Sequence, residues 1–270
     1  MSTDADAWRG VSLTSLRRSL AQLGEAEHGD FAMRVLRLAG VPEDHFDACV
    51  QVDTPAGGLY AAYSRHGLTS SLLCAVVAGR SEFEELHWRS TGRRAICTSR
   101  VPDGVHAAVR TGRAGLLRVD DTAMAGLDRA VLGVVQVIPR GQLRPLSWVG
   151  RDAGVADPGL VLGALERNPL QLLVPCHRVT HDNGQPCDAA YGPAAGQMLR
   201  QAEGIGPARI ERLVVSRTVY LGNGPSRTFC YPTCTDAGRT APEDQRPFGS
   251  AVQAQRAGYR PCRSCRPVTS

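Results

Sequence analysis

The sequence of 270 residues predicts an α/β protein followed by a small cysteine-rich domain. Short apolar segments typical of strands occupy about residues 48–100, and apolar residues at helical spacing run through 122–203. After Gly204, proline, glycine, arginine and cysteine become frequent. Hydrophobic residues make up 43% of the chain and charged residues 21%, which allows a buried core and excludes global disorder.

Two amphipathic segments precede the strands. Residues 12–24 and 31–39 place leucines and other apolar residues at helical spacing, and each segment ends at a glycine, so we expect two small covering helices. The N-terminus is polar and acidic, unlike a secretory signal, and no apolar run approaches the roughly 18 residues of a membrane span. We therefore expect a cytoplasmic protein with no membrane partner.

The next part of the chain predicts a sheet. Strands are expected at ACVQVDT, GLYAAYS and RRAICTS, with TPAGG as the turn between the first two, and the apolar run LLCAVVA is a candidate for a further buried strand.

Helical spacing then returns. We expect a helix at 122–138 that Pro139 ends, and then two shorter helices near 145–153 and 158–166. A short strand, QLLV, leads into Pro175, and the last helix of this part is expected at about 193–203.

Positive charge is concentrated in the last quarter of the chain. Residues 206–270 contain ten arginines against four acids, a formal charge of +6, whereas the whole chain has a net charge of +5. A basic domain of this kind favours a polyanionic partner, most often nucleic acid, and a solvated arginine face is the alternative.

The nine cysteines form an odd set in a chain expected to stay in a reducing compartment. We therefore interpret them as metal ligands or reactive groups, not as disulfides. Four of them have no distinctive setting and are expected to be plain buried or surface residues: Cys49, Cys74, Cys97 and Cys187. Trp148 and His87 are likewise expected to be packing or core residues.

Cys176 is the candidate nucleophile. It follows an expected strand and Pro175, so it lies on a constrained turn, and His177 beside it offers a general base or a cation that lowers the thiol pKa. The dipeptide alone is equally compatible with a structural cysteine. Asn168 lies eight residues upstream, and Glu203 closes the following helix.

These residues, with VDTPAGGLYAAY, LDRAVLGVVQVIPRGQL, NPLQLLVPCHRV and LRQAEG, resemble the O6-alkylguanine-DNA alkyltransferase family over about residues 46–205. The resemblance implies a ribonuclease-H-like α/β domain followed by a winged-helix-like helical domain. It also implies that an alkylated guanine is flipped out of double-stranded DNA and that its alkyl group passes irreversibly to Cys176.

The resemblance also implies a role for each matched residue. His177 relays the thiol proton through water, Glu203 orients His177, and Asn168 braces the turns of the site. Val179, with Arg178 next to it, lies beside the flipped base.

The sequence departs from the family pattern at the DNA-binding helices. Gly159 stands where the family has an arginine that fills the space of the flipped base, and Leu146 stands where it has a tyrosine that rotates the target phosphate. Asp157 and Glu166 add negative charge to the recognition helix, which opposes a phosphate backbone. The loop after the active site, QPCDAAYG, is also altered.

The pairs Cys230-x3-Cys234 and Cys262-x2-Cys265, separated by 27 residues, predict a tetrahedral four-cysteine zinc site. Zinc would close a domain too small to hold itself together. Between the pairs, Ser250-x-x-Gln253 is a capping box for a helix that ends near Gly258.

The segments TFCYPTC and RPFGSAVQAQRAGYRPCRSCRP resemble the metal-binding DNA-repair domain of Ada over about residues 214–267, although that domain is N-terminal in Ada. The resemblance implies that zinc-bound Cys230 accepts a methyl group from a methyl phosphotriester. It also implies that Arg260, Arg263 and Arg266 contact DNA, while Ser264 replaces a further basic residue.

The expected organisation is a helical lead-in (1–45), a ribonuclease-H-like α/β domain (46–120), a winged-helix-like alkyltransferase domain (121–205) and a zinc-binding domain (206–270). The first hypothesis is a monomeric, nucleoid-associated, single-turnover alkyltransferase that repairs alkylated double-stranded DNA. The second is a DNA-damage sensor whose guanine site is inactive because of Gly159 and Leu146. The third is a structural zinc protein with no role on DNA.

Overall fold

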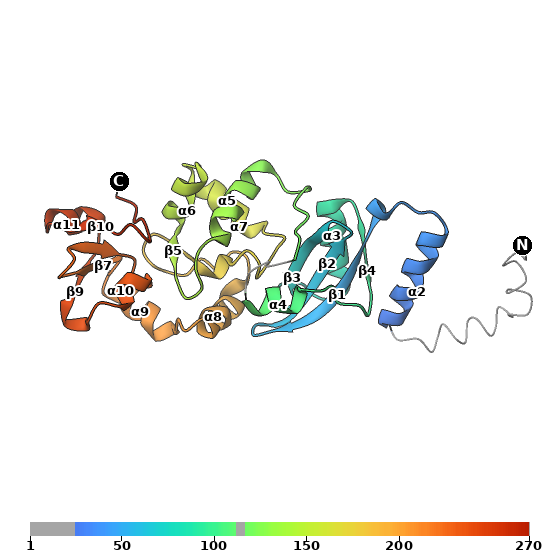
Figure 1. Ribbon diagram of the computed structural model, residues 1–270, viewed down its shortest axis with the longest axis horizontal. Helices are drawn as coiled ribbons and strands as arrows, with labels where there is room; N and C mark the ends of the chain where they lie inside the picture. Colours follow the sequence, from blue (N-terminus) through green and yellow to red (C-terminus); the bar gives the residue numbers. More distant parts are fainter. Residues whose placement is uncertain (1–24, 112–116, 270) are drawn as a thin grey trace, which may run out of the picture.

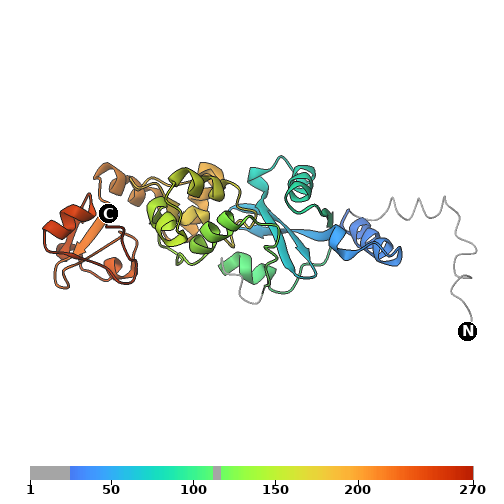
Figure 2. The same cartoon turned by 90° about the horizontal axis from the view of Figure 1, so that it is seen from above.

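The computed structural model describes residues 25–111 and 117–269 of the chain. These residues form an elongated molecule with a sheet module at one end, a helical module in the middle and a cysteine module at the other end (Figure 1). The view from above keeps the same order (Figure 2). Within the described ranges, no helix has the length and apolar character needed to cross a membrane. The expected helix at 12–24 lies outside the described residues.

The sheet module contains four strands in the order β3-β2-β1-β4, in which β4 is parallel to β1 and the other neighbours are antiparallel. The strands are β1 (Phe46–Thr54), β2 (Gly57–Ser64), β3 (Gly67–Leu73) and β4 (Arg94–Cys97). The helices of this module are α2 (Glu25–Leu38), α3 (Arg80–Thr91) and α4 (Val105–Thr111). The expected strands at ACVQVDT, GLYAAYS and RRAICTS are confirmed.

Two expectations about this module are corrected. Only the first two residues of LLCAVVA belong to β3, because the chain turns into a 3-10 helix over Cys74–Val76. The expectation of no disulfide is wrong, because Cys49 and Cys97 are direct partners between β1 and β4 and are joined by a disulfide. The parallel pairing brings their Cα atoms to 4.3 Å, a separation that sequence spacing does not reveal.

The helical module surrounds a short parallel strand pair. Its helices are α5 (Gly126–Gln136), α6 (Leu146–Ala153), α7 (Pro158–Glu166) and α8 (Gly192–Ala202), and α9 (Pro207–Val215) leads to the next module. The strand pair is β5 (Arg144–Pro145) with β6 (Val179–Thr180). The helices expected near 145–153, 158–166 and 193–203 are confirmed, whereas the one expected at 122–138 is shorter.

The expected strand QLLV is wrong. Its residues form a tight loop with one isolated bridge between Gln171 and Val174. Leu172 has a φ of 71°, in the left-handed region that a strand residue does not adopt. Hydrogen bonds with the side chains of Asn168 and Tyr191 hold the loop in this conformation.

The cysteine module is a small sheet in the order β10-β8-β7-β9 with two short helices. Its elements are β7 (Tyr220–Asn223), β8 (Thr228–Cys230), α10 (Thr235–Gly238), β9 (Gln245–Phe248), α11 (Ala251–Arg256) and β10 (Arg260–Pro261). The expected cap of α11 is confirmed, because Ser250 Oγ accepts the Gln253 amide at 3.2 Å.

One hydrophobic cluster extends through all three modules. It includes Val50 in the sheet module, Val149 and Val174 in the helical module, and Phe229 in the cysteine module. The modules are therefore packed against one another, and their side chains can act across the boundaries.

Candidate functional site

Cys176 lies at the start of a short 3-10 helix, Cys176–Arg178, and only 1% of it is exposed. Burial raises the pKa of its thiol to about 12, although a hydrogen bond from Asn168 Nδ2 to Sγ, at 3.2 Å, acts in the opposite direction. The resting side chain is therefore a protonated thiol held in a defined position, and reaction requires a base that removes its proton.

Asn168 and Tyr191 fix the loop that carries this thiol. Asn168 donates to the Val174 carbonyl at 3.2 Å and accepts from the Leu170 amide at 2.9 Å. The Tyr191 hydroxyl donates to the same Val174 carbonyl at 2.9 Å and accepts from the Cys176 amide at 3.2 Å. Sequence reasoning identified Asn168 but missed Tyr191, whose only signal was the altered loop in which it lies.

Glu203 organises the two basic side chains that follow Cys176. Its carboxylate lies 3.0 Å from His177 Nε2 and 2.7 Å from Arg178 Nη2. Burial opposes ionisation of Glu203, but hydrogen bonds from His177 and Arg178 outweigh it and lower its pKa to about 2. Burial also lowers the pKa of His177, so its imidazole is neutral near pH 7. His177 Nδ1 is buried and has no hydrogen-bond partner among the residues that the structure describes.

Arg178 and Val179 follow Cys176 closely in the sequence, but Arg178 makes polar contacts and Val179 is buried in the core. Arg178 donates to the Ile138 carbonyl at 2.6 Å as well as to Glu203, so its guanidinium is committed to internal contacts. Val179 is fully buried on β6.

A cavity of about 910 Å³ opens beside the thiol loop. Asn168 and Tyr191, whose side chains hydrogen-bond Cys176, are among its lining residues, and so is Arg167, which follows α7. Ser70 and His87 from the sheet module are also among its lining residues. His87 has partners on both ring nitrogens, Asp47 at 3.0 Å and Ser70 at 2.7 Å, as expected of a core histidine.

Helix α7, which lies where the recognition helix is expected, contains no basic residue. Gly159 and Leu160 are exposed on it, and Arg167 just beyond it is engaged by Asp128 at 2.7 Å. Leu146 is 7% exposed and belongs to the hydrophobic core. Gly159, Leu160 and Leu146 therefore place neither a cation nor a hydroxyl at this surface, and the charge of Arg167 is paired with Asp128.

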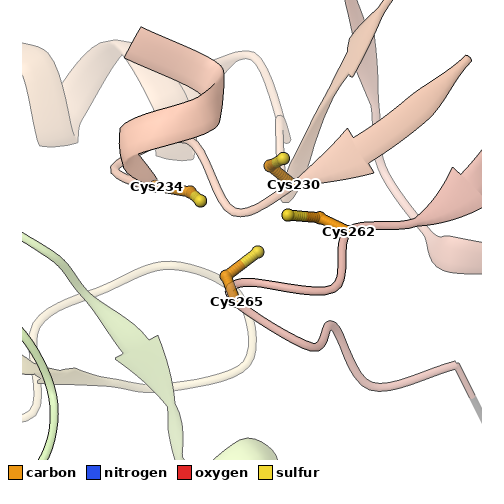
Figure 3. A group of neighbouring side chains, drawn as sticks. All are labelled: Cys230, Cys234, Cys262 and Cys265. Carbon is orange, nitrogen blue, oxygen red and sulfur yellow. The ribbon is translucent and has the colours of Figure 1, made fainter. Parts of the chain in front are cut away.

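The four cysteines of the last module converge on one point (Figure 3). Cys230 ends β8, Cys234 caps α10, and Cys262 and Cys265 follow β10; all four sulfur atoms lie within 4.8 Å of one another. A tetrahedral zinc with Zn–S bonds of about 2.3 Å separates its sulfur ligands by roughly 3.8 Å. The cluster therefore fits zinc, as the spacing predicts.

The exposed arginines of this module differ in their engagement. Arg260 and Arg263 are exposed beside the metal site. Arg266 forms an ion pair with Asp152, and its guanidinium lies 5.7 Å from the Trp148 ring centroid. Cys230 is only 1% exposed in this arrangement.

The cysteine module is docked directly on β5 and α6. Trp148 Nε1 donates to the carbonyl of Cys265 at 3.0 Å, and the Leu143 amide donates to Thr233 Oγ1 at 2.7 Å. Trp148 is a packing residue, as expected, but sequence reasoning missed its contact with a metal-ligand residue.

Both chemical regions match known families. Residues 126–205 match the family described as "6-O-methylguanine DNA methyltransferase, DNA binding domain", and residues 215–268 match "Metal binding domain of Ada". The first region contains Asn168, Cys176 and Glu203, and the second contains all four clustered cysteines.

Individual proteins similar to this chain are named as methyltransferases of this kind. The chain is 40% identical over 77 residues to a methylated-DNA–protein-cysteine methyltransferase of Methanothermobacter thermautotrophicus, a match covering 28% of this chain and 43% of that protein. It is 30% identical to the Shigella flexneri protein of the same name, covering 44% of this chain and 73% of the relative. A solved structure, the O6-methylguanine-DNA methyltransferase of Pyrococcus kodakaraensis, has a TM-score of 0.47 at 15% identity and covers 59% of this chain and 99% of that one.

Proposed function

Because the chain belongs to the methylated-DNA–protein-cysteine methyltransferase family, we propose that it transfers an alkyl group from O6-alkylguanine in double-stranded DNA to Cys176. The observation that carries this proposal is the assembly of a thiol and a neutral histidine on one braced loop with the buried carboxylate of Glu203, which comes from the end of α8. Each molecule acts once, because the thioether product has no easy leaving group.

Proton transfer prepares the thiol for attack. His177 accepts the Cys176 proton through a water molecule at its open Nδ1, while Glu203 holds the ring through Nε2 and stabilises the imidazolium that forms. The resulting thiolate attacks the alkyl carbon. A C–S bond forms as the C–O6 bond breaks, and the bonding electrons leave with guanine, which takes up one proton.

The large cavity beside Asn168 and Tyr191 is the proposed route for the flipped base. Its lining includes the two side chains that contact Cys176, so a base entering there approaches the thiol. Because Cys176 is 1% exposed, entry requires the Tyr191 ring to move. Val179, on the strand that leaves the site, is the proposed apolar contact for the base.

Cys230 is the proposed second acceptor, for the methyl group of a methyl phosphotriester. Bound zinc would keep the four sulfur atoms ionised as thiolates, the nucleophilic form. A neutral triester approaches this anionic cluster more easily than an ordinary phosphate does, and Arg260 and Arg263 offer contacts to the flanking phosphates. Because Cys230 is buried in the docked arrangement, this activity requires the cysteine module to expose it.

Peptide mass spectrometry of the zinc-loaded protein after incubation with O6-methylguanine duplex tests the first acceptor, and phosphotriester-containing DNA tests the second. One methyl group on the peptide with Cys176 is expected from the first substrate, and one on the peptide with Cys230 from the second. Cys176→Ser should abolish the first transfer, whereas Cys187→Ser, which changes another buried free cysteine, should leave it intact. Transfer to Cys187, or to neither site, would contradict the proposal.

A DNA-damage sensor is the second candidate function. It is favoured by the buried Leu146 on α6 and by the exposed, uncharged Gly159 on α7, because these two positions lack the tyrosine and the arginine that the family uses to flip a base. Lesion-dependent binding without methyl transfer to any cysteine would select this function.

The proposed organisation follows the family resemblance. Residues 46–120 form the ribonuclease-H-like domain, residues 121–205 the winged-helix-like domain, and residues 206–270 the zinc domain. The protein acts as a monomer at alkylated sites in the nucleoid.

A further inference from the structure

Arg144 is a buried cation without a carboxylate partner. It is 3% exposed, and within residues 25–111 and 117–269 it forms no ion pair with an acid. Two other arginines are buried to the same degree, and each of them faces a carboxylate at 2.7 Å: Arg178 faces Glu203, and Arg200 faces Asp188. Because an unpaired buried charge is costly, a different source of negative potential must compensate Arg144.

Neutral groups satisfy only part of this side chain. Arg144 Nη1 donates to the Leu143 carbonyl at 2.8 Å, and Nη2 donates to the Gln142 side chain. The guanidinium lies 5.4 Å from the ring centroid of Tyr231 and 5.7 Å from that of Trp148. Its Nε is buried and finds no hydrogen-bond partner within the described part of the chain.

The metal-site cysteines lie close enough to Arg144 to act on its charge. Burial lowers the pKa of its guanidinium, and the first groups to act in the opposite direction are the sulfur atoms of Cys265 and Cys234. Four thiolates around one zinc ion carry a formal charge of about −2. The cysteine cluster and Arg144 are both buried, so water does little to screen their attraction.

The backbone around the cluster is tied to the same short segment. Cys265 receives a hydrogen bond from Trp148, four residues after Arg144. On the other side, Thr233 and Thr235, which flank the ligand Cys234, accept hydrogen bonds from the Leu143 amide and the Gln142 side chain. The segments that carry the zinc ligands are therefore hydrogen-bonded to residues on either side of Arg144.

We propose that Arg144, supplied by the helical module, is the charge partner of the zinc–thiolate centre in the cysteine module. Zinc binding and docking of the cysteine module on β5 and α6 then strengthen each other. This inference rests on zinc binding but not on alkyl transfer to either cysteine, so it stands or fails separately from the proposed function.

Zinc affinity of the full-length protein, measured by competition with a chromophoric chelator, tests the charge partnership. Arg144→Met removes the charge and keeps an apolar stem, and we expect it to weaken zinc binding by about 10- to 100-fold, the range seen for groups that support metal ligands. Arg144→Lys keeps the charge and should retain most of the affinity. Arg151→Met is the matched control, because Arg151 bonds the carbonyls of Arg266 and Pro267 in the same interface.

Hydrogen exchange of the same proteins, with and without zinc, tests the docking. In the wild type, zinc should increase the protection of backbone amides at 142–152, which lie outside the metal-binding segment. In Arg144→Met this gain should be smaller even at zinc concentrations that saturate the site. Circular dichroism identifies any variant that is misfolded. If Arg144→Met is misfolded, the zinc affinity of Arg144→Lys and the zinc-dependent hydrogen exchange of the wild type test the proposal instead.

The proposal is overturned if Arg144→Met binds zinc as tightly as Arg151→Met does. It is equally overturned if zinc leaves the exchange of residues 142–152 unchanged in the wild type, because docking would then be independent of the metal.

Discussion

At the scale of single residues, Glu203 determines the charge state of the site. It fixes His177 through one oxygen and neutralises Arg178, and both partners are as buried as Glu203 itself. Removing only the carboxylate charge would leave Arg178 buried without an acid. Glu203 therefore organises the site. We expect its loss to lower the free energy of unfolding in addition to any effect on alkyl transfer.

We expect Glu203→Gln to lower the free energy of unfolding at pH 7 by about 3–5 kcal/mol. The pKa of Glu203 is depressed in the folded protein to about 2, so its ionised form stabilises the fold above its usual pKa near 4.5. That stabilisation is lost as pH falls from about 4.5 towards 2. Urea denaturation at several pH values measures both effects.

Between pH 4.5 and about pH 2, the free energy of unfolding of the wild type should fall towards that of Glu203→Gln, whereas the variant should lose little from this group. Glu211→Gln is the matched control, because Glu211 is an exposed glutamate on α9. A Glu203→Gln protein with wild-type stability at pH 7 would show that the carboxylate is dispensable.

Some site residues could be predicted from the sequence and others could not. Cys176, His177 and Asn168 lie within a short segment whose spacing is itself the signal. Tyr191 contacts Cys176 from 15 residues further along the chain, and the charge of Arg144 is acted on by cysteines that lie far away in the sequence, so no local pattern marks either relation. The disulfide between Cys49 and Cys97 was hidden for the same reason.

At the scale of secondary structure, α7 is flanked by acids and contains no arginine: Asp157 is its N-cap residue, Glu166 is its last residue, and both are exposed. Asp157 caps the helix by accepting the Gly159 amide at 2.8 Å, and a Cβ added at Gly159 would meet that flexible carboxylate at 3.2 Å. The backbone of Gly159 does not require glycine, because its φ lies outside the left-handed region. A larger side chain can therefore be introduced on the exposed face.

We expect Gly159→Arg to strengthen binding to duplex DNA and to increase the slope of log affinity against log salt concentration by about 1, since one more phosphate is neutralised. Fluorescence anisotropy across a salt series measures this. Gly133→Arg makes the same charge change on α5, where a Cβ has open space. Equal gains in both variants would assign the effect to net charge and not to α7.

Elements with a strong periodic signal were predictable, and elements defined by tertiary contacts were not. β1, β2 and α6 show clear alternation or helical spacing and occur where expected. QLLV has the composition of a strand, but it is held as a loop by Asn168 and Tyr191. Composition cannot distinguish the two outcomes, because the deciding hydrogen bonds come from residues outside the segment.

At the scale of the whole molecule, a different kind of cross-link stabilises each end of the elongated protein. The disulfide between Cys49 and Cys97 joins β1 to β4 in the sheet module, and the four-cysteine cluster closes the module at the other end. The nine cysteines thus divide by position into a disulfide pair, a metal set, the candidate acceptor Cys176, and two free side chains, Cys74 and Cys187.

Reduction of the disulfide should lower the free energy of unfolding by about 4 kcal/mol, because it constrains a loop with a sequence separation of 48 residues. Urea denaturation with and without a reductant measures this loss. A protein carrying both Cys49→Ala and Cys97→Ala should be insensitive to the reductant. If that variant responds as strongly as the wild type, the effect comes from the other cysteines.

The pairing of β5 with β6 has a thermodynamic consequence. Arg144 lies on β5 and is hydrogen-bonded in register with Val179, which follows the segment that carries Cys176. Linkage is reciprocal, so any effect of zinc on the affinity for damaged DNA must equal the effect of damaged DNA on the affinity for zinc. Heterotropic cooperativity between the zinc site and the Cys176 site can therefore be measured from either ligand.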